Sequence, residues 1–185
     1  MTLQQPDEIL GELARLGDHV VLLDAGQVRH SGPVMDLMTR LDLPLAHGDG
    51  AAALIEARIC DNAPDDLMCM LEFDGGKLTL PQTRTAPLPT GTKVRVRIQA
   101  RDVSVSLQKP EMTSVLNILP ATVMDMVEDG PGQVLLGLQL GNALQSTTAN
   151  TTRLLSRISQ LSARRLGVVP GMLLHAQIKG VAMVR

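Results

Sequence analysis

One lysine stands out among the residues whose type and position could do chemistry. Lys179 lies in the C-terminal stretch "HAQIKGVAMVR", where apolar and other residues alternate as they do in a half-buried strand. A cation in such a strand can meet an anion at a partly buried site. It can equally be a lysine on an edge strand whose long side chain reaches solvent. The residue type alone leaves both interpretations open.

The other reactive residues form no catalytic motif. In "FDGGKLTL", Lys77 is followed by leucine, whereas a P-loop ends in Gly-Lys-Ser or Gly-Lys-Thr, so a hairpin turn is predicted here. Acidic residues gather in "DNAPDD" and "VEDG", two predicted turns where carboxylates are normally solvated. The histidines lack metal-ligand spacing and are interpreted as structural: His19, His30, His47 and His175. We therefore expect no catalysis by these 185 residues alone.

Composition excludes further classes of protein. The net charge of -2 gives no general attraction to nucleic acid, and Phe73 is the only aromatic residue, so stacking on bases is not expected. Cys60 and Cys69 belong to no CxxC motif and are expected to be reduced thiols. "MTLQQPDEIL" does not resemble a signal peptide, and no apolar run reaches membrane-spanning length. We expect a cytoplasmic protein with an aliphatic core.

Periodicity and breakers divide the chain into three sections, 1–46, 51–107 and 113–185. The first combines a helix over 10–16, a hairpin in "HVVLLDAGQVRHSG" and a helix of about two turns opened by Pro33. The second and third sections alternate in the manner of antiparallel strands, with a hairpin turn at Asp74-Gly75-Gly76.

The second and third sections resemble each other. When "GTKVRVRIQARDVSVS" is laid over "GMLLHAQIKGVAMVR", Ile98 matches Ile178 and Gln99 matches Lys179, and "ARICD" also matches "ATVMD". We interpret this as a duplicated unit of about five strands, with extra residues in "QSTTANTT". Chance similarity between two β-rich sections is the alternative. Such units are typical of small closed or partly closed barrels.

Three stretches carry a resemblance to a known family. "LDAGQVRHSGP", "TSVLNILPA" and "LHAQIKGVAM" resemble the C-terminal region of molybdate ABC-transporter ATPase subunits, and the third section looks like a molybdate-binding MOP domain of the TOBE superfamily. The resemblance implies a mainly β fold of tandem OB-like barrels, preceded by a short α/β remnant of an ABC ATPase domain. It also implies a truncated member, because "TLQQ" stands where the catalytic histidine is expected.

The function implied by this resemblance is an accessory and regulatory region of a molybdate importer. It would form a homodimer, bind molybdate or tungstate, and reach the membrane permease through the parent ATPase. A stand-alone molybdate storage protein is the alternative, although it has no use for an ATPase tail. A small-barrel nucleic-acid binder is a third possibility that composition disfavours.

The resemblance also supplies candidate ligands for the anion. Molybdate is a tetrahedral dianion that needs several converging donors and a positive charge. The matching positions, which in the family line oxyanion sites between MOP units, are Ser114, Ser159, Ser162 and Lys179. Two positions depart from the family pattern: Leu116 stands where an arginine is common, and Gly180 stands where a hydroxyl often follows the lysine. The serines could otherwise serve only to cap the short helix that begins between them.

Overall fold

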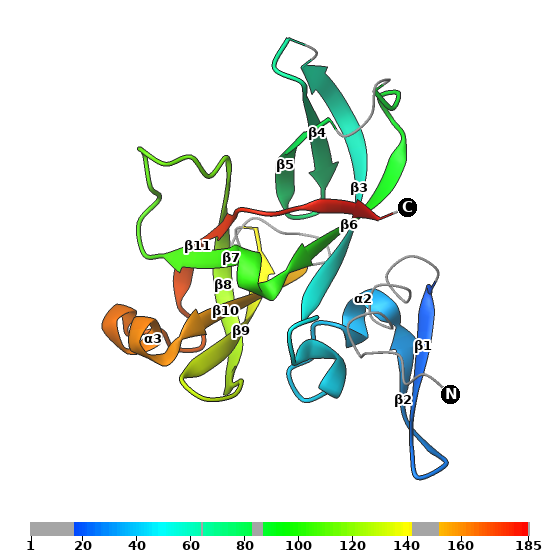
Figure 1. Cartoon of the computed structure of the whole chain (residues 1–185), viewed down its shortest axis with the longest axis vertical. Coiled ribbons are helices and arrows are strands. Elements are labelled where there is room, and N and C mark those ends of the chain that lie inside the picture. The colour runs from blue at the N-terminus through cyan, green and yellow to red at the C-terminus, as the bar shows by residue number, and fades with distance from the viewer. Residues whose placement is uncertain (1–16, 64, 83–86, 142–151, 185) are drawn as a thin grey trace.

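Most of the regular secondary structure is antiparallel β-strand. The computed structural model describes residues 17–63, 65–82, 87–141 and 152–184 (Figure 1). Within them lie a two-stranded hairpin and two five-stranded sheets. The helix expected over 10–16 and all but the last residue of "QSTTANTT" fall outside the described residues. No helix in the described part of the chain is long and apolar enough to cross a membrane.

The hairpin lies at the N-terminal side of the molecule. Strands β1 (His19–Asp24) and β2 (Gln27–Pro33) pair around a turn in which Ala25 and Gly26 adopt positive φ angles of 49° and 78°. Helix α2 (Val34–Leu37) follows and is shorter than the two turns expected, with Pro33 as its N-cap residue. The 3-10 helix η1 (Pro44–Ala46) then leads into the first sheet.

The first sheet has the strand order β12-β6-β3-β4-β5. Its strands are β3 (Ala52–Ala63), β4 (Met68–Phe73), β5 (Gly76–Pro81), β6 (Lys93–Gln99) and β12 (Ala182–Val184). The predicted turn at residues 74–76 is confirmed, since Phe73 pairs with Gly76 at the end of the β4–β5 hairpin.

The second sheet has the order β10-β9-β8-β11-β7. Its strands are β7 (Val103–Ser106), β8 (Asn117–Glu128), β9 (Gln133–Leu140), β10 (Arg153–Ser159) and β11 (Leu173–Ile178). Helix α3 (Gln160–Leu166) connects β10 to β11 and ends at Gly167, which adopts the left-handed conformation.

The last strand of each of the two β-rich sections pairs in the sheet formed mainly by the other section. Strand β7 belongs to section 51–107 but pairs with β11, and β12 belongs to section 113–185 but pairs with β6 (Figure 1). The 3-10 helix η2 (Ala100–Asp102) redirects the chain between β6 and β7. Each sheet therefore contains one strand from the other section, and the bounds 51–107 and 113–185 do not coincide with the two sheets.

Two buried polar side chains connect strands that no sheet pairing joins. The Ser156 hydroxyl donates to the Val103 carbonyl oxygen at 2.7 Å, which links the edge strands β10 and β7 and closes the second sheet. The Asn117 side chain accepts from the Thr79 N–H at 2.7 Å and donates to the Thr79 carbonyl oxygen at 2.9 Å. This second contact joins β8 to β5, so the two sheets hold each other in place.

One aliphatic cluster runs through both sheets. It joins buried residues such as Leu71 and Ile98 of the first sheet to Leu136, Leu138 and Ile178 of the second. The expectation of an aliphatic core is confirmed, because Phe73, the only aromatic residue, merely packs against the edge of this cluster.

Candidate functional site

The predicted serine pair lies at the start of α3. Ser159 is the N-cap residue, and its hydroxyl oxygen accepts a hydrogen bond from the Ser162 N–H at 3.0 Å. The two hydroxyl oxygens lie 2.8 Å apart, so one hydroxyl donates to the other. Two hydroxyls carry two hydrogens and their mutual contact uses one, which leaves one O–H donor for a ligand. The pair therefore caps the helix and retains limited capacity to bind an anion.

Lys179 and Ser114 lie near the start of β8 instead. Lys179 follows the last residue of β11, where Ile178 pairs with Asn117, and its side chain is exposed. Extending this register by one residue places Lys179 opposite Leu116. Ser114 is exposed two residues earlier in the chain. The structure thus groups Lys179 with the segment 114–116.

The serine pair and Lys179 occupy opposite ends of the second sheet. Ser159 pairs with Gln133, and Val134 beside it pairs with Glu128 at the far end of β8. Strand β8 has twelve residues, which span about 36 Å when extended, less where the strand bulges near Asp125. The register of one chain does not bring all four predicted site residues to a single tetrahedral anion.

The two departures from the family pattern have different structural settings. Leu116 is 66% exposed, so a longer side chain fits at that position. At Gly180 the Asp102 side chain leaves no room for a larger residue. A Cβ atom added to Gly180 would lie 2.7 Å from Asp102 Oδ2 and 3.0 Å from its Cγ. The Lys179 N–H also donates to the Asp102 carbonyl oxygen at 2.9 Å. A carboxylate therefore occupies the space where a hydroxyl-bearing side chain would begin.

A cluster that the sequence did not reveal lies close to the serine end. Arg157 of β10 donates from Nε to Asp129 Oδ2 at 2.7 Å, and His47 Nδ1 lies 2.9 Å from Asp129 Oδ1. Both side chains of the Arg157–Asp129 pair are only 9% exposed. Asp129 belongs to "VEDG", so the expectation of a solvated carboxylate in that turn is wrong for this residue. His47 and Arg157, the charged side chains beside Asp129, are 82 and 28 positions away in the sequence. A pattern of neighbouring residues cannot predict such contacts.

The cluster shifts the ionisation of two of its members. Burial lowers the pKa of His47, but the hydrogen bonds to Asp129 and to the Leu41 carbonyl oxygen more than offset this, so the pKa is raised overall. Burial raises the pKa of Asp129, and the contacts with His47 and Arg157 outweigh it, so that pKa is lowered. Both directions favour the charged forms.

A cleft over the first sheet is a less suitable anion site. Its volume is about 890 Å³, and it lies over β3, β4 and β6 beside Asp18. Arg95 in this cleft is already paired, at 2.7 Å with Asp18 and 3.3 Å with Glu56. With these acidic side chains beside it, the cleft offers no excess of positive charge. Among the described residues no group of His, Cys, Asp or Glu side chains could hold a metal ion.

Curated relatives match nearly the whole chain. It is 45% identical over 175 residues to a molybdenum import ATP-binding protein, ModC, of Albidiferax ferrireducens, covering 95% of this chain and 44% of that protein. It is 42% identical over 175 residues to the ModC of Aromatoleum aromaticum, covering 94% and 43%. The matches lie in the C-terminal halves of these proteins, so the chain spans somewhat less than half of their length. No protein-family model matches the chain.

A solved structure shares the fold. The cytoplasmic molybdate-binding protein ModG, in a crystal form with molybdate bound, superimposes with a TM-score of 0.55 at 20% identity. The match covers 71% of this chain and 95% of that protein. At this level of identity the likeness concerns the fold, and it confirms the predicted mainly β, OB-like architecture.

Proposed function

The chain belongs to the molybdenum import ATP-binding protein family and corresponds to the C-terminal part of its relatives, and we propose that it is the accessory and regulatory region of such a subunit. The observation that carries this proposal is the 45% identity over 95% of the chain. The 185 residues contain no P-loop sequence, so ATP hydrolysis would depend on the other part of a parent protein. The region would act on the cytoplasmic side and reach the membrane permease through that parent.

The ligand we propose is molybdate or tungstate, bound between two copies of the chain. Lys179 and Ser114 of one copy would meet the serine pair at the start of α3 of the other. Two observations support this: these groups lie at opposite ends of β8, and each retains exposed donors. A lysine contributes the positive charge that a dianion requires, and one hydroxyl of the serine pair remains free to donate.

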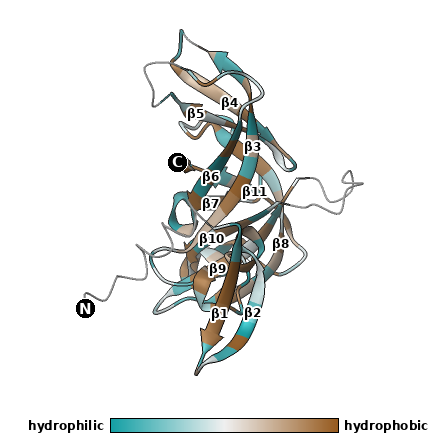
Figure 2. Cartoon of the chain, turned by 90° about the vertical axis from the view of Figure 1, so that its right-hand side faces the viewer, coloured by the Kyte–Doolittle hydropathy of each residue, from teal (hydrophilic) through white to brown (hydrophobic). Residues whose placement is uncertain are grey.

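A stand-alone storage protein is the alternative within the same ligand class. The hairpin β1–β2 disfavours it, because Val21, Leu23 and Val28 are 50%, 66% and 61% exposed. Figure 2 shows the apolar colour concentrated along β1. Such a surface suits a hairpin that packs against a further domain, which a storage protein would not need.

Calorimetry combined with light scattering tests the proposal on the full chain. We expect molybdate and tungstate to bind more tightly than sulfate, and the mass to be that of a dimer at tens of micromolar. Lys179→Ala should weaken binding, whereas Lys93→Ala, which removes an exposed lysine from the other sheet, should not. A monomer that binds no oxyanion at millimolar concentration would contradict the proposed site.

A further inference from the structure

A charged cluster outside the proposed anion site joins segment 41–51, which follows β1, β2 and α2, to the second sheet. We propose that His47, Asp129 and Arg157 form a pH-sensitive clamp, which holds segment 41–51 more tightly on the second sheet when His47 is protonated and loosens it when His47 loses its proton. This inference does not depend on oxyanion binding. It concerns how the section that carries β1, β2 and α2 is held against the sheets.

Each nitrogen of the His47 ring lies beside an oxygen that accepts a hydrogen bond. His47 Nδ1 lies 2.9 Å from Asp129 Oδ1, and Nε2 lies 2.8 Å from the Leu41 carbonyl oxygen. A carbonyl oxygen only accepts, and the Asp129 carboxylate, ionised beside Arg157, also only accepts. Both ring nitrogens must therefore carry hydrogen, which is the imidazolium form. A neutral ring has one N–H, so one of these two contacts would set a nitrogen lone pair against an oxygen.

The charged groups around the His47 ring determine how strongly the protonated ring is held. Among the described residues, the charged groups that face His47 are Asp129, whose carboxylate attracts the imidazolium, and Arg157, whose guanidinium opposes it. Asp129 is in hydrogen-bond contact with the ring at 2.9 Å and its side chain is 9% exposed, so its attraction is poorly screened by solvent. The His47 side chain is 32% exposed, which lets it exchange its proton with bulk water.

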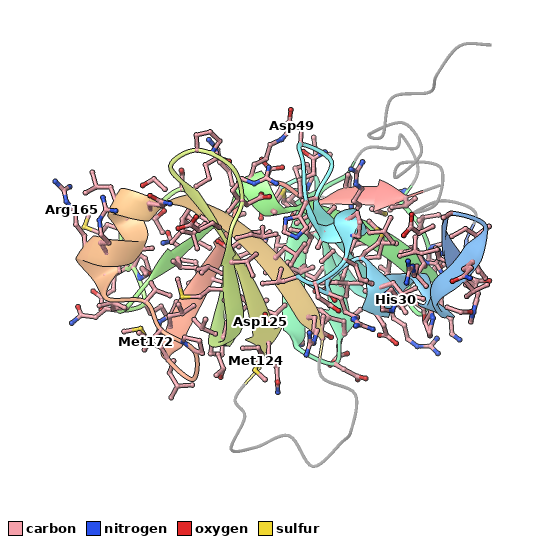
Figure 3. The ribbon with its side chains drawn as sticks, turned by 90° about the horizontal axis from the view of Figure 1, so that it is seen from below. His30, Asp49, Met124, Asp125, Arg165 and Met172 are labelled. Atoms are coloured by element: carbon pink, nitrogen blue, oxygen red, sulfur yellow. The ribbon has the colours of Figure 1, made fainter. Side chains whose placement is uncertain are left out.

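Beside the clamp, segment 41–51 packs against the second sheet through apolar side chains. Leu41, Ala46 and Ala51 of the segment are buried against Leu135 of β9 and Leu155 of β10. Arg157 also donates to the Gly48 carbonyl oxygen, so the same guanidinium holds the segment directly. In Figure 3, Asp49 marks the tip of this segment, between Arg165 on α3 and His30 on the hairpin.

The direction of the pH effect follows from linkage. The pKa of His47 is raised in the docked state, so docking is strengthened fully below the ordinary histidine value of about 6.5. This contribution is lost as the pH rises through the docked pKa. Above that value it is absent, and docking depends on the apolar contact, on Arg157, and on the hydrogen bonds that Arg97 and the Ala100 N–H donate to the carbonyl oxygens of Gly50 and Ala51.

Two measurements on the full chain test the clamp together. The His47 ring is titrated by NMR through its Cε1–H signal, and amide exchange, corrected for intrinsic rates, is followed at Ala46 and Ala51, which donate to Leu43 and Gly48. We expect a His47 pKa above 6.5 and protection that falls across the same pH interval. The fall should be tenfold for every unit by which the docked pKa exceeds that of the released segment.

Matched variants separate the clamp from general effects of pH. His47→Gln should abolish the pH step in protection, while His19→Gln, which replaces a ring bonded to Ser31 on the hairpin, should preserve it. The proposal is overturned if His47 titrates at or below 6.5, if protection at Ala51 is independent of pH, or if His47→Gln keeps the step. Should His47→Gln fail to fold, the two wild-type measurements decide the matter by themselves.

Discussion

The side-chain amide of Asn117 pairs with the main chain of Thr79 as a neighbouring strand would. It accepts from the Thr79 N–H and donates to the Thr79 carbonyl oxygen, with N···O distances of 2.7 and 2.9 Å. Asn117 is 8% exposed, and it begins β8 while Thr79 lies in the edge strand β5. One carboxamide thus fastens the two sheets beside the segment that leads from Ser114 into β8.

Asn117→Ala should destabilise the protein by about 1–3 kcal/mol, because both main-chain groups of Thr79 lose their partner in a largely buried setting. Chemical denaturation monitored by circular dichroism measures this. Gln133→Ala, which truncates an exposed side chain on β9, is the control and should change stability little. Equal stabilities of the two variants would show that the contact contributes nothing.

Lys179→Ala should weaken molybdate binding by about tenfold or more, because a charge-assisted contact contributes roughly 1.5–3 kcal/mol. Ser162→Ala should also weaken binding, and it leaves the Ser159 oxygen free to accept from the residue 162 N–H, so helix α3 should keep its cap. Calorimetry gives the affinities. An unchanged affinity for Lys179→Ala would remove this lysine from the site.

Leu116→Arg should tighten oxyanion binding. Leu116 is 66% exposed and follows Ser114 by two residues, so a guanidinium can extend into solvent near Lys179 without displacing buried atoms. Titrations of molybdate, tungstate and sulfate into wild type and this variant provide the comparison. Sulfate should remain the weakest ligand, since its oxygens lie closer to its centre. Failure to gain affinity would show that segment 114–116 does not face the anion.

Gly180→Ser should not restore binding in the same way. The new Cβ would lie 2.7 Å from Asp102 Oδ2, so Asp102 must move, and we expect a loss of about 1–3 kcal/mol of stability. Replacing Asp102 by alanine in the same chain should recover most of that loss. Thermal unfolding of the two single variants and the double variant measures the coupling. Additive effects would show that the close approach is harmless.

The β1–β2 hairpin should exchange its amide hydrogens faster than β8 and β9. It is only two-stranded, and Val21, Leu23 and Val28 remain exposed, whereas β9 is buried along most of its length. Hydrogen exchange with mass spectrometry resolves these segments. Addition of the N-terminal part of a full-length relative should protect the hairpin, if it packs there. Equal protection in the isolated chain would contradict this account of the first section.

The sequence by itself determined the type and approximate position of most strands. Alternation of apolar residues identified β6 and β11, and the glycine-containing turns placed the hairpins of β1–β2 and β4–β5. These features are local: whether a residue faces a core depends on a period of two, and a turn depends on which residues tolerate positive φ. The resemblance between the two closing segments was equally visible, since it too is a property of the residues in order.

Tertiary structure decided everything that depends on which distant residues become neighbours. The pairing of β7 with β11 and of β12 with β6 cannot be derived from periodicity, because alternation specifies a buried face and not a partner strand. Asp129 was expected in solvent, and only the approach of His47 and Arg157 buries it. Likewise Gly180 is confined by Asp102, 78 positions earlier, and Lys179 lies at the other end of β8 from the serine pair. Contacts of this kind form when the chain folds back on itself, so they have no signature in any short stretch of residues.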